Sequence, residues 1–204
     1  MTALAAAQRE VFAAVCTELG PDAPTLIDWT TKELVAHVYV REHRPDAAPG
    51  VLPLGPLSAY TERVMQSVLR TQGYDALVAA VRTAPPWLRV GGLDDAINTV
   101  EFFVHTEDVR RANGLAPRPV DMGLEHWVWE RLRRQARLSF RRVPAKVRLV
   151  PTVGEPVTVG KGGAEVEVRG RPTELMLLAY NRKDAADVEV SGDKSALWSA
   201  KIGL

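Results

Sequence analysis

Apolar residues in the first two thirds of the chain recur at the three- and four-residue spacing of an amphipathic helix. The first such stripe, Leu4, Val11, Val15 and Leu19, predicts a helix over residues 3–19. Gly20 and Pro21 follow directly, a pair typical of a helix C-terminus. The chain therefore opens with a helix that turns one apolar face towards a core.

Helix-end signals delimit the next elements. Thr30 precedes Glu33 by three residues, which is the spacing of a capping box, so a second helix should begin there and end near residue 44, before Pro45. Ser58 can cap a third helix over residues 59–70. Further helices are predicted over residues 74–82, 93–112 and, capped by Asp121, up to about residue 142, with a Pro-rich loop over residues 45–57.

After residue 143 the pattern changes to short alternating runs. Residues 164–168 alternate strictly between apolar and polar side chains, as a half-buried strand does. Strands are predicted over residues 146–150, 155–159, 164–168 and 187–190, and helices over 172–180 and 193–200. The expected fold class is α+β: a four-helix bundle domain over residues 1–143 and a small α/β domain over residues 144–204.

Composition narrows the classes of function. The 204 residues include 26 Lys and Arg and 25 Asp and Glu, so the net charge is +1, without the basic excess of a nucleic-acid binder. No apolar run approaches the roughly 20 residues that span a bilayer, and the N-terminus lacks the features of a secretory signal. We therefore expect a cytoplasmic protein with no nucleic-acid or membrane partner. Cys16 is the only cysteine, so any transition metal must be held by His and carboxylates.

A local basic cluster lies near the end of the helical part. We interpret it as a solvated helix face with salt bridges to the C-terminal domain, although an anionic partner or a substrate carboxylate is an alternative. Two other histidines, His43 and His126, are assigned to a helix-end loop and to packing, and Cys16 to packing as a small hydrophobe. The cluster consists of Arg131, Arg133, Arg134, Arg137, Arg141 and Arg142.

A polar stripe on the predicted helix 93–112 carries the candidate chemistry. At about 100° per residue its members fall within an arc of about 80°. Glu101 and His105, four residues apart, lie on one face, so that a carboxylate oxygen and an imidazole nitrogen can converge on one ion. His37, among apolar neighbours of the second helix, is the best third ligand. The stripe consists of Asp94, Asn98, Glu101, His105 and Asp108.

Each of these residues has an ordinary alternative. His37 can be a core histidine with satisfied hydrogen bonds, and the stripe can be a solvated face. Asp108, one turn beyond His105, can orient the imidazole or pair with Arg110 or Arg111. Asn98 can line a ligand pocket or hydrogen-bond the helix backbone.

Three segments together resemble a known family. Residues 29–37, 98–105 and 108–112 are similar to the metal-binding domain of mycothiol-dependent maleylpyruvate isomerase, in the DinB-like superfamily. Residues 41–50 are also similar to an uncharacterised branch of that family described as metal-binding proteins. The resemblance implies a DinB-like four-helix bundle and one zinc ion held by His37, Glu101 and His105.

The function implied by this resemblance follows from the ligand count. Three protein ligands leave a fourth position open, as in catalytic zinc sites, and zinc can hold a bound thiol deprotonated. We expect a metal-dependent thiol transferase or isomerase that uses a low-molecular-weight thiol such as mycothiol with an electrophilic substrate. Asn98 and Asp108 would support cofactor binding. A homodimer is a further expectation, because bundles of this kind often pair. The alternative is a DinB-like protein that binds a metal or small molecule without catalysis.

Overall fold

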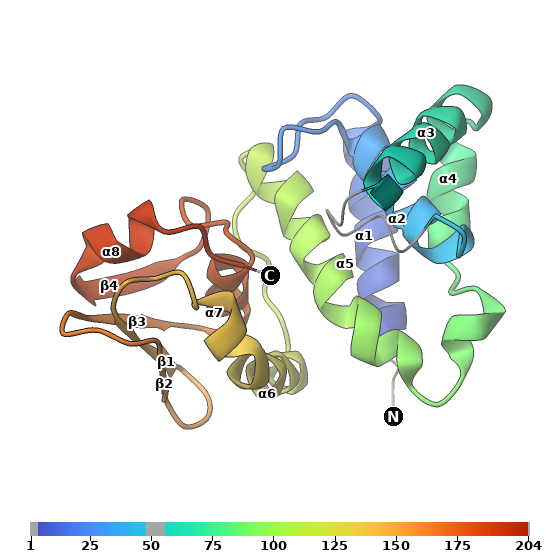
Figure 1. Ribbon diagram of the computed structural model, residues 1–204. Coiled ribbons are helices and arrows are strands. Elements are labelled where there is room, and N and C mark those ends of the chain that lie inside the picture. Colours follow the sequence, from blue (N-terminus) through green and yellow to red (C-terminus); the bar gives the residue numbers. More distant parts are fainter. Residues whose placement is uncertain (1–3, 48–55, 204) are drawn as a thin grey trace. The chain divides into compact units, whose positions relative to one another are not determined.

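A computed structural model describes residues 4–47 and 56–203 (Figure 1). Its contacts divide the chain between Ala116 and Pro117 into two compact units, called unit 1 (residues 1–116) and unit 2 (residues 117–204). The boundary lies upstream of the one expected at residue 143. Helix α6 (Met122–Ser139) is thus part of unit 2, because it packs against helix α7 (Pro172–Ala179) of the same unit.

Unit 1 is helical in its described part, in agreement with the expected helical N-terminal region. Helix α1 packs against α5 and α4, and α2 packs against α3 and α4. Their apolar faces form a core that includes Phe12, Leu34, Leu77 and Phe102. The elements are α1 (Leu4–Leu19), α2 (Thr31–His43), α3 (Pro56–Thr71), α4 (Tyr74–Val81), the 3-10 helix η2 (Pro86–Arg89) and α5 (Leu93–Ala112).

The capping box at the start of α2 forms as predicted. The backbone N–H of Glu33 donates to Oγ1 of Thr30, and the backbone N–H of Thr30 donates to the Glu33 carboxylate at 2.7 Å. This reciprocal pair satisfies two of the N–H groups that a helix start leaves without a partner. It fixes the first turn of α2, the helix that carries His37.

One expected helix start in unit 1 was wrong, and one short helix was not predicted. Helix α3 begins at Pro56, so Ser58 lies inside the helix and is not its cap; proline suits a first helical position because its missing N–H needs no partner there. The 3-10 helix η2 lies between the predicted helices over residues 74–82 and 93–112, where no element was predicted. Of the predicted loop 45–57, residues 48–55 lie outside the described residues.

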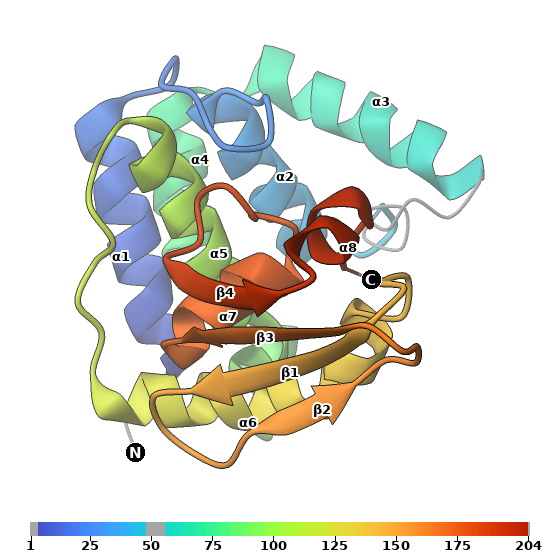
Figure 2. The same ribbon diagram turned by 90° about the vertical axis from the view of Figure 1, so that its left-hand side faces the viewer.

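Unit 2 contains a four-stranded mixed sheet with the strand order β2-β1-β3-β4 (Figure 2). β1 and β3 are parallel, and the two outer pairs are antiparallel. Helices α6 and α7 pack together and contact the sheet, and α8 contacts β3. The bounds are β1 (Lys146–Pro151), β2 (Val157–Val159), β3 (Glu165–Gly170), β4 (Val188–Gly192) and α8 (Lys194–Ser199).

Glu125 joins α6 to the start of α7. Its carboxylate accepts hydrogen bonds from the backbone N–H and the hydroxyl of Thr173, both at 2.9 Å. A carboxylate at a helix N-terminus satisfies unpaired N–H groups and complements the helix dipole. Helices and a mixed sheet together make the chain α+β, as predicted.

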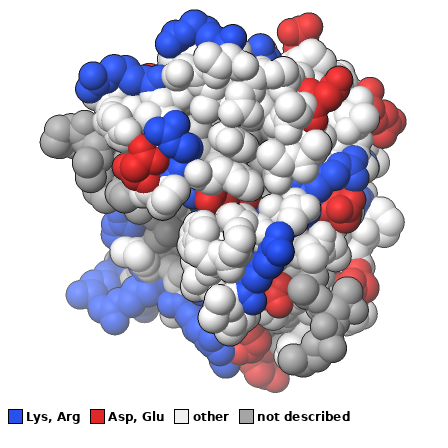
Figure 3. Space-filling model, turned by 90° about the vertical axis from the view of Figure 1, so that its right-hand side faces the viewer, with Lys and Arg blue, Asp and Glu red and all other residues white. Residues whose placement is uncertain are grey.

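No helix of the described residues is long and apolar enough to cross a membrane. Basic and acidic side chains both occur on the molecular face drawn in Figure 3. That distribution agrees with the near balance of charges in the sequence.

Candidate metal centre

Helix α5 spans the predicted residues, and its polar stripe is largely buried. Asn98 and Asp108 are fully buried, and His105 is 8% exposed. Glu101 is partly exposed. A solvated face is therefore excluded for most of the stripe, and each buried polar group needs a partner because burial without one is costly.

The three predicted ligands lie together. The rings of His37 on α2 and His105 on α5 meet edge to face, with their centroids 5.7 Å apart and their planes at 82°. Oε2 of Glu101 lies 3.5 Å from Nε2 of His105. Two helices distant in sequence thus bring two imidazoles and one carboxylate to one place.

Asp108 holds the other side of the His105 ring. Its Oδ2 lies 3.0 Å from Nδ1 of His105, and the Asp108 side chain is fully buried. When Nδ1–H donates to this carboxylate, the lone pair of the neutral ring is on Nε2, the nitrogen that faces Glu101. A carboxylate in this role is typical of histidines that bind metals.

The pKa values of the two histidines are shifted in opposite directions. Burial lowers the pKa of His37, and the neighbouring charges of His105 and Arg41 lower it further. Burial also acts to lower the pKa of His105, but the carboxylates of Asp108 and Glu101 outweigh it and raise that pKa above 6.5. For Glu101 burial acts to raise the pKa, and the contact with His105 and the charge of Arg41 outweigh it, so the carboxylate stays ionised.

The donor set suits a divalent metal. Two imidazoles and a carboxylate are ligands that zinc accepts, and two imidazoles that share one ion at Zn–N distances of about 2.1 Å have ring centroids on the order of 5 Å apart. Within residues 4–47 and 56–203, no three His, Cys, Asp or Glu side chains are already arranged to hold a metal ion. The residue types therefore suit the ion, and the rings of His37 and His105 lie near each other, but the described side chains are not arranged to coordinate one.

Two neighbours of the site were missed by the sequence analysis. Trp29 packs beside His37, with 5.1 Å between the ring centroids, and forms an apolar wall. Arg41 lies close enough to His37 and Glu101 to influence both pKa values. Because Arg41 follows His37 by four residues, helical spacing alone could have placed it on the same face.

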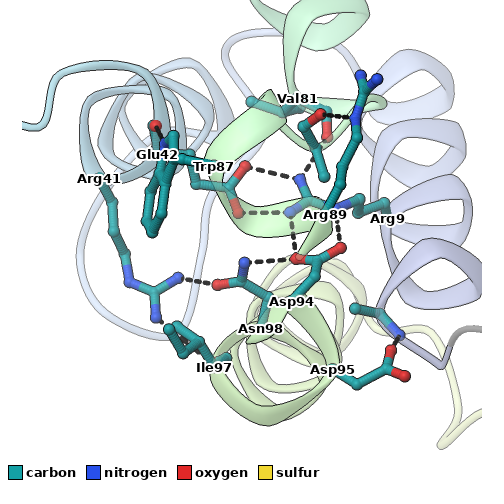
Figure 4. Close-up of polar contacts among 12 residues, drawn as sticks. Arg9, Arg41, Glu42, Val81, Trp87, Arg89, Asp94, Asp95, Ile97 and Asn98 are labelled. Atoms are coloured by element: carbon teal, nitrogen blue, oxygen red, sulfur yellow. Dashed lines mark hydrogen bonds and ion pairs between the residues drawn. The ribbon is translucent and has the colours of Figure 1, made fainter. Parts of the chain in front are cut away.

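Asn98 belongs to a buried polar network, shown in Figure 4. Nη1 of Arg41 donates to its Oδ1, and its Nδ2 donates to Oδ1 of Asp94 at 2.7 Å. These two side-chain partners differ from both roles considered for Asn98, a pocket lining and a bond to its own helix backbone. Asn98 therefore fixes the guanidinium of Arg41 beside the candidate metal centre.

The same network contains the buried Arg9 of α1 (Figure 4). Its Nη1 and Nη2 donate to the Glu42 carboxylate at 2.6 and 2.8 Å, and Nη2 also donates to Asp94 at 2.6 Å. The remaining N–H groups reach Asp94 and the carbonyl of Val81. Arg9 thus ties α2 to α5, the two helices whose alignment brings His37 to His105.

The other singled-out side chains lie apart from this site. Cys16 is fully buried in the core, as expected for a small hydrophobe. His43 is the last residue of α2, so it lies at the end of the helix and not in the loop that we expected to contain it. Its ring stacks on that of Tyr39, with 4.8 Å between the ring centroids. His126 is exposed on α6, and its assignment to packing was wrong because its position faces away from the apolar side of that helix.

The basic cluster is a solvated face, as expected, but the ion pairs of Arg133 and Arg134 lie within their own helix and not with the C-terminal strands and helices. Arg133 and Arg134 pair with Glu130 of their own helix, at 2.9 and 3.9 Å. The ion pair between α6 and the start of α7 is instead made by Arg171, which reaches Glu125 of α6 at 3.8 Å and also pairs with Glu174 of α7 at 3.0 Å.

Comparison with known proteins leaves the family open. No family model and no solved structure matches the chain. The chain is similar to coagulation factor VIII of Sus scrofa, with 29% identity over 103 residues. That match covers 49% of this chain and 4% of the length of factor VIII, too little of either to assign a family.

Proposed function

We propose that unit 1 binds one divalent metal ion, zinc, through His37, Glu101 and His105. The observation that supports this most is the meeting of His37 and His105 from two helices, with Asp108 bound to the far nitrogen of His105. A buried carboxylate at Nδ1 would serve little purpose for packing, but it directs Nε2 towards Glu101. The proposal retains the DinB-like superfamily and the cytoplasmic location suggested by the sequence.

We further propose that the protein is a metal-dependent thiol transferase or isomerase whose co-substrate is a low-molecular-weight thiol such as mycothiol. When bound, the metal would supply a positive charge that keeps the thiol sulfur deprotonated and nucleophilic. Asp108 would keep His105 in the tautomer that coordinates, and Trp29 would shield one side of the site from water. Arg41, held by Asn98, would attract the negative charge of the incoming thiolate or of an electrophilic substrate.

The test measures bound metal in protein purified without chelator. Wild type, His105→Ala and the matched control His126→Ala are compared, since His126 is an exposed histidine of unit 2. We expect near one zinc per chain in wild type and in the control, and a large loss in His105→Ala. Near-zero metal in all three, before and after incubation with zinc, would overturn the metal site.

The thiol is tested separately on the zinc-loaded protein. Mycothiol should bind saturably to wild type and control, and binding should disappear in His105→Ala. Zinc without any mycothiol response would leave the metal site standing and reject the transferase or isomerase in favour of the non-catalytic binding protein.

A further inference from the structure

Unit 2 has a cavity of about 640 Å³ between the C-terminal end of α6 and the loop that follows β2. It is formed entirely within unit 2, apart from the candidate metal centre of unit 1. Its lining residues are Arg137, Arg141, Arg142, Val143, Pro144, Thr158, Val159, Gly160 and Lys161. Four basic side chains and no acidic one therefore line this cavity.

The neighbouring sequence supplies no acidic side chain to neutralise the basic side chains of this cavity. Residues 131–154 contain no Asp or Glu. Upstream on α6, Arg133 and Arg134 share Glu130. Among the described residues, Arg137, Arg142 and Lys161 have no ion pair or side-chain hydrogen bond. Cations gathered without counter-charges repel one another, and a bound anion would relieve that repulsion.

One arginine of the cavity is held in place. Nη1 of Arg141 donates to the carbonyl oxygens of Leu138 at 2.7 Å and Gly203 at 3.1 Å. These bonds satisfy a carbonyl at the end of α6 and leave the other N–H groups of the guanidinium for a ligand. A fixed guanidinium loses less freedom on binding an anion than a mobile one does.

Another part of the lining, Gly160 and Lys161, belongs to a glycine-rich turn over residues 160–163. Gly160 has a φ of +87°, and a Cβ at this position would collide with the carbonyl oxygen of Ala145. The chain can therefore come this close to the α6–β1 connection only with glycine at residue 160. This close approach carries Lys161 to the cavity that the α6 arginines line.

We propose that this cavity binds a small phosphate-bearing anion. Its volume lies in the range of about 300–1,000 Å³ typical of small-molecule sites and exceeds that of one phosphate, so it suits a phosphate ester or diphosphate. Arginine forks and a lysine point charge are the side chains that proteins use for phosphate groups. A duplex nucleic acid would need a broad basic surface, whereas here Arg137, Arg142 and Lys161 line one hollow.

The experiment titrates inorganic pyrophosphate into the full chain by isothermal titration calorimetry, at low and at moderate salt. The cavity variant Arg142→Gln/Lys161→Gln is compared with Arg131→Gln/Arg134→Gln, which removes the same charge from exposed positions of α6 outside the cavity. We expect saturable binding that weakens with salt, and a loss of about tenfold or more in affinity in the cavity variant only. Circular dichroism verifies that both variants are folded.

Four results would overturn the proposal. Pyrophosphate that does not bind wild type rejects the site. Equal weakening in both variants indicates general attraction to the α6 arginines, and a short DNA duplex bound more tightly than pyrophosphate indicates a nucleic-acid surface instead. Unchanged binding in both variants places the anion elsewhere, the candidate metal centre included, and leaves the proposed metal function unaffected.

Discussion

The carboxylate of Asp108 and Nδ1 of His105 lie 3.0 Å apart, three residues along one helix, and both side chains are almost completely buried. The next turn towards the N-terminus places Glu101 on the opposite side of the same ring. The imidazole of His105 is thus held between two carboxylates, one at each nitrogen. This relationship gives the ring a fixed orientation, and it raises the pKa of His105.

Replacing Asp108 by Asn should weaken the metal centre without removing a ligand. The uncharged amide polarises the ring less and no longer selects one tautomer, so zinc affinity should fall by about 10- to 100-fold. Competition with a chromophoric chelator measures the dissociation constant. Asp75→Asn, at an exposed position of α4, is the matched control and should leave it unchanged. Wild-type affinity in a folded Asp108→Asn protein would contradict the orienting role.

Zinc affinity should fall steeply as the solution becomes acidic. A metal binds the unprotonated imidazole, and Asp108 and Glu101 raise the pKa of His105 above 6.5 despite its burial. Below that raised pKa the dissociation constant should increase about tenfold per pH unit, because one proton must leave for each ion bound. His37 should not add to this slope near neutral pH, because burial lowers its pKa.

Measuring zinc affinity against pH in Asp108→Asn tests whether Asp108 is a cause of the raised pKa of His105. Loss of one carboxylate lowers the pKa of His105, so the onset of zinc release should move to lower pH. An onset that stays in place, or moves upward, would show that Asp108 does not control the protonation of His105.

Helix positions were predictable where the signals are local. The capping box at Thr30 and the glycine boundaries of α5 act through neighbouring residues, so the sequence contains all the information needed. The start of α3 was missed because Ser58 and Pro56 both provide start signals, and only the packed structure distinguishes them. The unit boundary was missed for a similar reason: α6 looks like one more bundle helix until its partner, α7, is known.

The residues of the candidate site also fall into two groups: those that local spacing predicts and those that depend on the packing of distant segments. Periodicity placed Glu101, His105 and Asp108 on one face because they share a helix, whereas His37 came from a plausible guess and a family resemblance. The contacts of Arg9 with Glu42 and Asp94 connect residues far apart in the chain, and no spacing rule predicts them. Asn98 was singled out as a polar member of the stripe, but its partners, Arg41 and Asp94, depended on how α2 lies against α5.

Cys16 should be inert in the folded protein. Burial raises the pKa of its thiol to about 12, so the reactive thiolate is absent at neutral pH and reagents cannot reach the sulfur. A chromogenic disulfide reagent at pH 8 should label no thiol in the native state and one per chain in guanidinium chloride. Rapid stoichiometric labelling of native protein would show that α1 opens or packs differently.

Removal of the Arg9 charge should destabilise unit 1 far more than removal of an exposed charge. Arg9 is 1% exposed, and its loss leaves Glu42, equally buried, without its counter-charge. Breaking a buried ion pair from one side costs about 3–5 kcal/mol, so Arg9→Met should lower the free energy of unfolding by that order in urea denaturation. The control Arg82→Met removes an exposed pair with Glu10, for which a loss of about 0–1 kcal/mol is expected.

Replacing the partner as well, in Arg9→Met/Glu42→Leu, should recover much of the loss, because the uncompensated carboxylate is gone. Equal effects of Arg9→Met and Arg82→Met would show that Arg9 does not hold α2 against α5.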